Sequence, residues 1–233
     1  VIDSFDEISR VSKIAKELNK VQKIYLRLTP GVDAHTHEFI STAHEDVKFG
    51  FSIASGAAQD AIENCMAQSS LSLAGIHCHI GSQIFEVDGF NLAAKRLVAV
   101  LATFRDKYAK ELPELNIGGG YGIAYTKEET AIAPELVIPA IAAVIKEECA
   151  KAKLAIPRIS IEPGRAIVGP TTTTIYLVGT TKSVTLDNGS ERRYVSVDGG
   201  MSENIRPALY GATYSAFLAN RTSSAKNISS RIV

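Results

Sequence analysis

Apolar runs of strand length alternate, along the first 169 residues, with longer segments whose apolar positions repeat at helical spacing. Gly or Pro lies at or near the end of every strand-like run, and these runs lie at 23–32, 73–81, 115–122 and 159–169. The helix-like segments lie at about 5–19, 56–68, 88–110 and 134–152. Regular alternation of strand and helix predicts a parallel α/β sheet with right-handed crossovers.

The pattern changes after residue 169. Runs rich in β-branched residues at 171–186 and 192–200 flank a polar turn, and no helix-like segment separates them. We expect these runs to pair antiparallel in a second domain, which divides the chain into residues 1–169 and 170–233. A closed (β/α)8 barrel has eight βα units, but the first domain holds only about five. The sequence therefore predicts either a small open sheet or part of a barrel.

The composition of the chain limits the classes of function that we expect for it. The chain has 233 residues, of which 45% are hydrophobic, with 25 basic and 25 acidic side chains and zero formal net charge. This balance favours a globular protein and gives no electrostatic reason to expect nucleic acid or a membrane surface as partner. Three cysteines without metal-type spacing favour a reducing cytoplasm. Neither end resembles a natural terminus, so we expect an internal fragment.

Polar residues gather where the predicted parallel strands end, which is the edge at which α/β folds build their sites. The second run leads into "HCHIGSQ" (77–83), the third into three glycines (118–120) and the fourth into "EPGR" (162–165). Consecutive glycines let backbone N–H groups approach a phosphate. Glu162 follows an apolar strand, and a buried carboxylate there would need a partner. These three strand ends are expected to form one pocket.

Each motif also has a plainer interpretation. His77 and His79 share one side of a strand, where such pairs are more often core residues than ligands. The glycines alone indicate only a turn or close packing, without the spacing of a dinucleotide site. "EPGR" alone fits a capping salt bridge. Arg206 and Tyr210 stand at i and i+4, which suits either a helix-surface pair or a clamp for a carboxylate.

A metal-dependent barrel hydrolase is the alternative from another class of protein. The loop at 31–50 is rich in histidine, and the set of possible ligands would be His35, His37, His77 and His79. Glu38 and His44 lie in the same loop. The first two histidines lie several residues beyond the predicted strand, which weakens this interpretation, and no metal is expected.

Taken together, these motifs resemble the pyridoxal 5'-phosphate (PLP) decarboxylases of the alanine-racemase fold. "HIGSQ", "GGG" and "EPGR" are typical of the whole group, whereas "HTHEFISTAHEDVKFG" and "MSENIRPALYGA" are similar to the diaminopimelate decarboxylase family. The resemblance implies part of a PLP-binding (β/α)8 TIM barrel, about strands four to eight, followed by the start of a β-barrel or β-sandwich domain.

The resemblance also implies an activity, which is decarboxylation of meso-2,6-diaminopimelate to L-lysine and CO2, the last step of lysine biosynthesis. The enzyme would be a cytoplasmic homodimer with a shared active site. The family's Schiff-base lysine and a catalytic cysteine match no position here, so the chain alone is expected to be inactive. Sister PLP decarboxylases acting on ornithine, arginine or carboxynorspermidine remain the alternative within the same class.

Roles for individual residues follow from the same resemblance. His79 would stack on the cofactor ring, and Glu162 would pair with its pyridine nitrogen; these two are the expected catalytic residues. The phosphate would be held by Ser82, Gly119, Gly120, Pro163, Gly164 and Arg165. The substrate would contact Arg165, Arg206 and Tyr210.

Overall fold

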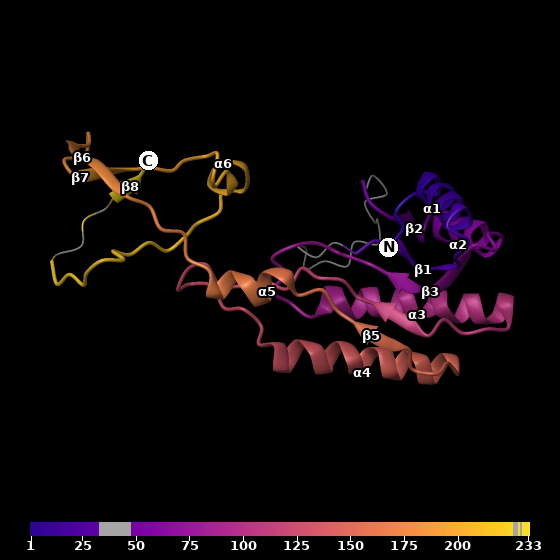
Figure 1. The fold of residues 1–233 in the computed structure, drawn as a ribbon. Coiled ribbons are helices and arrows are strands. Elements are labelled where there is room, and N and C mark those ends of the chain that lie inside the picture. The colour runs from indigo at the N-terminus through magenta and orange to yellow at the C-terminus, as the bar shows by residue number, and fades with distance from the viewer. Residues whose placement is uncertain (33–47, 226–227, 229) are drawn as a thin grey trace. The chain divides into compact units, whose positions relative to one another are not determined.

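The computed structural model describes residues 1–32, 48–225, 228 and 230–233. Within them the chain forms two compact units, drawn in Figure 1. The first unit comprises residues 1–123 and 130–170, and the second comprises residues 124–129 and 171–233. The second unit thus takes a short segment from inside the predicted first domain, and the division at 169/170 stays a prediction.

In the described part of the first unit, five strands form one parallel sheet in the order β2-β1-β3-β4-β5. The strands are β1 (Gln22–Thr29), β2 (Phe51–Ser52), β3 (Leu71–His77), β4 (Glu114–Asn116) and β5 (Arg158–Ser160). The long helices are α1 (Phe5–Glu17), α2 (Ala57–Met66), α3 (Asp88–Tyr108) and α4 (Pro134–Ala152). The connections from β2 to β3, from β3 to β4 and from β4 to β5 run in the same direction along the sheet, and right-handed crossovers in one direction place their helices on one face.

Burial along β1 shows which face of the sheet carries the core. Ile24, Leu26 and Leu28 are buried, whereas Tyr25 and Arg27 between them are half-buried. A strand places alternate side chains on opposite faces, so one face of β1 packs into the core and the other remains partly open. Helices α3 and α4 lie side by side in Figure 1 and supply buried side chains to the same core.

Turn chemistry sets the ends of several elements. Ser4 caps α1 by accepting a hydrogen bond from the Glu7 N–H at 3.3 Å. α4 begins at Pro134, the residue expected in its first turn. The prediction of one strand-like run over 159–169 was wrong beyond Ser160. Pro163 ends the extended segment, and α5 (Gly164–Val168) and a 3-10 turn (Gly169–Thr171) follow it.

The second unit contains a small mixed sheet. β6 (Val178–Thr185) pairs antiparallel with β7 (Glu191–Val197), as the sequence predicted, although β6 begins later than the predicted run. β8 (Ser230–Ile232) pairs parallel with β7, and α6 (Arg206–Tyr210) lies between them in the chain. Of the helices described in either unit, none is long and apolar enough to cross a membrane.

Candidate active site

The carboxyl ends of three neighbouring strands bring the predicted site residues together. His77 at the end of β3 stands opposite Asn116 at the end of β4, and Asn116 stands opposite Ser160 at the end of β5. Glu162 follows two residues later. Because parallel strands end at the same edge of a sheet, residues far apart in sequence become neighbours here. Arg27 of β1 stands opposite His77 on the other side.

Glu162 already has partners within the protein. Its Oε1 accepts a hydrogen bond from Asn116 Nδ2 at 2.9 Å, and its Oε2 lies 3.2 Å from His77 Nε2. Partial burial raises the pKa of Glu162, but its interactions with His77, Asn116 and His79 together outweigh this effect and hold the pKa below its ordinary value. With 47% of its side chain exposed, this ionised carboxylate can accept a further donor.

His79 presents a neutral imidazole beside this carboxylate. Its Nδ1 accepts a hydrogen bond from the Gly119 N–H at 3.3 Å, which leaves the ring proton on Nε2. Partial burial and the nearby positive charge of Arg27 lower the pKa of His79. The residue is exposed, so a flat ligand has room to stack on its ring.

The three glycines bring the loops after β3, β4 and β5 into direct backbone contact. A Cβ on any of them would clash with a backbone carbonyl oxygen of a neighbouring loop: that of Cys78 for Gly118, of Glu162 for Gly119 and of Gly81 for Gly120. Gly118 and Gly120 also have φ values of +75° and +106°, which disfavour other residues. The motif is therefore required by packing as well as suited to an anion.

Donors suited to a phosphate meet at the same loops. Arg165 Nη2 donates to Ser82 Oγ at 3.1 Å, which places a guanidinium beside a hydroxyl. Within the described residues, the Gly120 N–H has no hydrogen-bond acceptor. The space where a Gly164 side chain would lie is open. Together with the ionised Glu162 and the exposed His79 ring, these groups fit a planar, phosphate-bearing cofactor.

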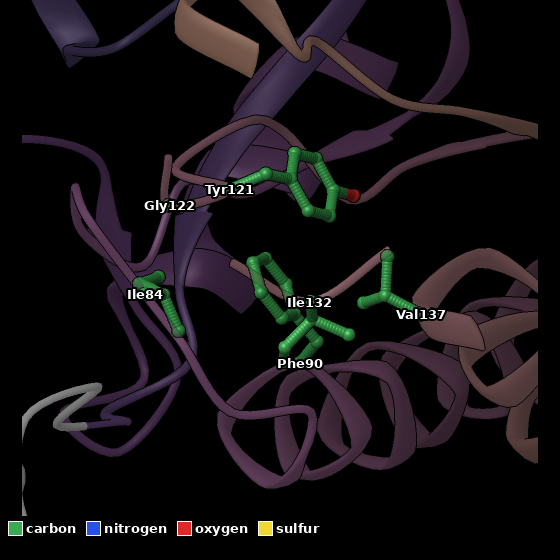
Figure 2. Close-up of a pocket in the computed structure, with 6 residues that line it drawn as sticks. All are labelled: Ile84, Phe90, Tyr121, Gly122, Ile132 and Val137. Atoms are coloured by element: carbon green, nitrogen blue, oxygen red, sulfur yellow. The ribbon is translucent and has the colours of Figure 1, made fainter. Parts of the chain in front are cut away.

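An apolar layer supports the glycine loop (Figure 2). Tyr121 stacks on Phe90, with ring centroids 4.7 Å apart and planes at 10°, at a small pocket that Ile132 and Val137 also line. Gln83 exchanges two 3.0 Å hydrogen bonds with the backbone of Ile123. These contacts fix the loop after β4 against the loop after β3.

Two groups at this edge were not predicted from the sequence. Asn116 was overlooked because its role depends on Glu162, 46 residues later; its position just before the glycines was the available signal. Arg27 was also overlooked. Its guanidinium lies 3.4 Å from Asp3 Oδ1 and 4.6 Å from the centroid of the Phe49 ring, and its charge lowers the pKa of His79.

Other predicted residues are placed differently. Arg206 and Tyr210 belong to the second unit, where the guanidinium lies over the phenol ring at 5.3 Å, and their contact with substrate stays a prediction. His35 and His37 lie outside the described residues. Among the residues that are described, no group of three or more His, Cys, Asp or Glu could hold a metal ion.

A parallel α/β sheet whose strand ends combine a glycine turn, an Arg–Ser pair and an ionised carboxylate defines a cofactor-binding protein of the barrel class. The family model described as "Pyridoxal-dependent decarboxylase, pyridoxal binding domain" matches residues 1–169. The chain belongs to this family of pyridoxal-dependent decarboxylases, whose cofactor is PLP. Its parallel sheet is part of a TIM barrel followed by a small mixed sheet, which confirms the predicted fold class.

Within this family, the chain is similar to several diaminopimelate decarboxylases. The chain is 47% identical over 233 residues to diaminopimelate decarboxylase of Corynebacterium efficiens, covering 100% of this chain and 51% of that protein. It is 45% identical to that of Bacillus subtilis, covering 95% and 49%. The solved structure of diaminopimelate decarboxylase from M. jannaschii with L-lysine is 29% identical, with a TM-score of 0.76, covering 92% and 48%. The chain thus spans about half the length of these relatives.

Proposed function

We propose that the protein to which this chain belongs is a diaminopimelate decarboxylase, which converts meso-2,6-diaminopimelate to L-lysine and CO2. One observation carries the proposal: 47% identity to such an enzyme extends over the whole chain. The strand-end site lies within the stretch that matches the pyridoxal binding domain. An amino acid is therefore the proposed substrate and PLP the cofactor.

The site residues have distinct proposed roles. PLP, when bound, accepts the electrons left on the substrate's α-carbon as CO2 departs, and does so best with its ring nitrogen protonated. The negative charge of Glu162 holds a proton at that nitrogen. The exposed ring of His79 stacks on the cofactor ring and orients it. The phosphate is bound by Ser82, Gly119, Gly120, Pro163, Gly164 and Arg165.

Recognition of the substrate needs groups that bind carboxylates at both ends of diaminopimelate. We assign this role to Arg165, Arg206 and Tyr210, because a guanidinium is a forked donor and a phenol supplies a hydroxyl. Arg165 donates a hydrogen bond to Ser82, which is one of the proposed phosphate-binding residues. The contribution of Arg206 and Tyr210 is testable by the KM of variants such as Arg206→Met.

The proposed setting is a cytoplasmic homodimer with a shared active site. All three cysteines are buried and free, which suits a reducing compartment. Light scattering of the purified full-length protein should give twice the monomer mass; a monomer would contradict this part of the proposal.

A substrate comparison tests the activity. The full-length protein with PLP should release CO2 from meso-diaminopimelate and yield lysine by chromatography, and it should act at least about 100-fold less well on ornithine, arginine or carboxynorspermidine. Faster turnover of ornithine would transfer the assignment to a sister enzyme. Stoichiometric zinc without the visible absorbance of PLP would favour a metal-dependent hydrolase.

A further inference from the structure

The Glu162 carboxylate is held by one protein donor on each oxygen. Asn116 Nδ2 lies 2.9 Å from Oε1, and His77 Nε2 lies 3.2 Å from Oε2. Asn116 and His77 come from the ends of neighbouring strands and stand opposite one another in the sheet. Because each oxygen has its own donor, rotation of the carboxylate about its last bond would break both contacts.

The orientation of the Asn116 amide follows from its second partner. The Gly118 N–H donates to Asn116 Oδ1 at 2.8 Å, so the amide NH2 group must face Glu162. The Glu162 backbone N–H in turn donates to the Gly118 carbonyl at 2.8 Å. Asn116, Gly118 and Glu162 therefore form a closed circuit of three hydrogen bonds that links the glycine loop to the carboxylate.

The protonation of His77 follows from its surroundings. Only 4% of the residue is exposed, and burial lowers its pKa, so the ring is neutral at neutral pH. A carboxylate can only accept, so the single ring proton lies on Nε2 and is donated to Glu162. Nδ1 is buried and has no partner within the described residues, which agrees with this tautomer.

We propose that Asn116 and His77 are positioning residues, whose N–H groups fix the ionised Glu162 carboxylate in the orientation in which it meets the ring nitrogen of PLP. This inference rests on the proposed function, because it assigns the partners of the residue that acts on the cofactor. Asn116 also ties the phosphate-binding glycine loop to that carboxylate, so the two ends of the cofactor site are set by one side chain.

The test measures the pKa of the Glu162 carboxyl group directly. In the full-length, cofactor-free protein with 13C-labelled glutamate carboxyls, Glu162→Gln identifies the Glu162 signal, and its titration gives the pKa. Asn116→Leu and His77→Phe each remove one donor at nearly constant volume and should raise this pKa. Asn116→Asp keeps an acceptor for the Gly118 N–H but adds a like charge, so it should raise the pKa further.

Two controls separate positioning from general damage. His77→Gln retains an N–H donor and should leave the pKa of Glu162 near its wild-type value. Glu63, whose carboxylate pairs with Lys107 and Gln59, should titrate unchanged in every variant. If Asn116→Leu fails to fold, Asn116→Asp and the His77 pair carry the test. An unchanged pKa of Glu162 in Asn116→Asp and His77→Phe would overturn the proposal.

Activity then distinguishes the two proposals. With PLP and diaminopimelate, His77→Phe should lower kcat about tenfold or more with a smaller change in KM, and His77→Gln should restore most of it. Raised pKa values of Glu162 with wild-type kcat would overturn the positioning role in catalysis. Wild-type kcat in Glu162→Gln would instead refute the proposed function of Glu162 itself.

Discussion

At the scale of single residues, the charge of Glu162 is set by groups that its own sequence neighbours do not reveal. Placing a carboxylate at the end of an apolar strand raises its pKa, whereas His77 and Asn116 lower it by donating to its two oxygens. With the contribution of His79, the lowering of the pKa is larger than the raising, so the site holds a negative charge before any cofactor arrives. A negative charge nearby stabilises the protonated form of a ring nitrogen.

Replacing Glu162 by Gln tests that charge while preserving the size of the side chain. We expect kcat of the full-length enzyme to fall about 100-fold or more, because the charge that stabilises the protonated ring nitrogen is lost. The dissociation constant for PLP should change much less, since Arg165 and Ser82, which lie within hydrogen-bond distance of one another, are the proposed donors to its phosphate. Steady-state kinetics and a PLP titration measure both. Equal losses in kcat and in PLP affinity would contradict this division of roles.

At the scale of elements, the glycine loop after β4 is the part of the site most constrained by packing. Gly119 is buried, and a Cβ there would clash with the Glu162 carbonyl oxygen. At the glycines, the backbones of three loops from three strands therefore lie in direct contact. Any side chain added between them must displace the strand ends on which the site is built.

Gly119→Ala should therefore destabilise the protein, whereas Gly164→Ala should not. We expect Gly119→Ala to lower the free energy of unfolding by about 1–3 kcal/mol, because the clash is with backbone that cannot move aside. Gly164 is the matched control, since its Cβ would meet nothing within 4 Å. Thermal denaturation of both variants under identical conditions provides the comparison. Similar melting temperatures for the two would show that the loops can separate at little cost.

Element type was predictable from the sequence where the apolar period was long enough to recognise. β1, β3 and the four long helices lie where the pattern placed them, and β6 and β7 pair antiparallel as expected. β2 is only two residues long, which is too short to show an alternation of apolar and polar residues. β8 joins β7 across more than thirty residues, a pairing that no local pattern specifies.

The site was predictable in part for a related reason. His79, Ser82, Gly119 and Glu162 were predicted because they fall in motifs at strand ends, and the structure brings these strand ends together. Asn116 carries no motif of its own. Its importance arises from the sheet register, which sets it opposite His77 and within reach of Glu162. Their roles toward PLP stay predictions until cofactor binding is measured.

At the scale of the whole molecule, the site's histidines couple protonation to stability. Burial lowers the pKa values of His77 and His79 in the folded protein below the ordinary value of 6.5. In the unfolded chain they return towards that value, so below about pH 6.5 the unfolded state binds more protons than the folded state. Stability contributed by neutral His77 is therefore complete above this pH and is lost as the pH falls through the window beneath it.

We accordingly expect the melting temperature to be lower at pH 5.5 than at pH 7.5, and His77→Gln to reduce that difference. Glutamine occupies a similar volume and keeps a donor for Glu162, but it does not titrate. The part of the pH dependence that is lost in His77→Gln is therefore the part due to protonation of the His77 imidazole. The lowered pKa of Glu162 acts in the same direction only at more acidic pH, near its ordinary value of 4.5 and below. Melting curves of the two proteins across pH 5–8 measure the effect. An identical slope in wild type and His77→Gln would show that His77 keeps its ordinary pKa in the folded protein. A melting temperature that rises on acidification would contradict the expected direction of the pH dependence.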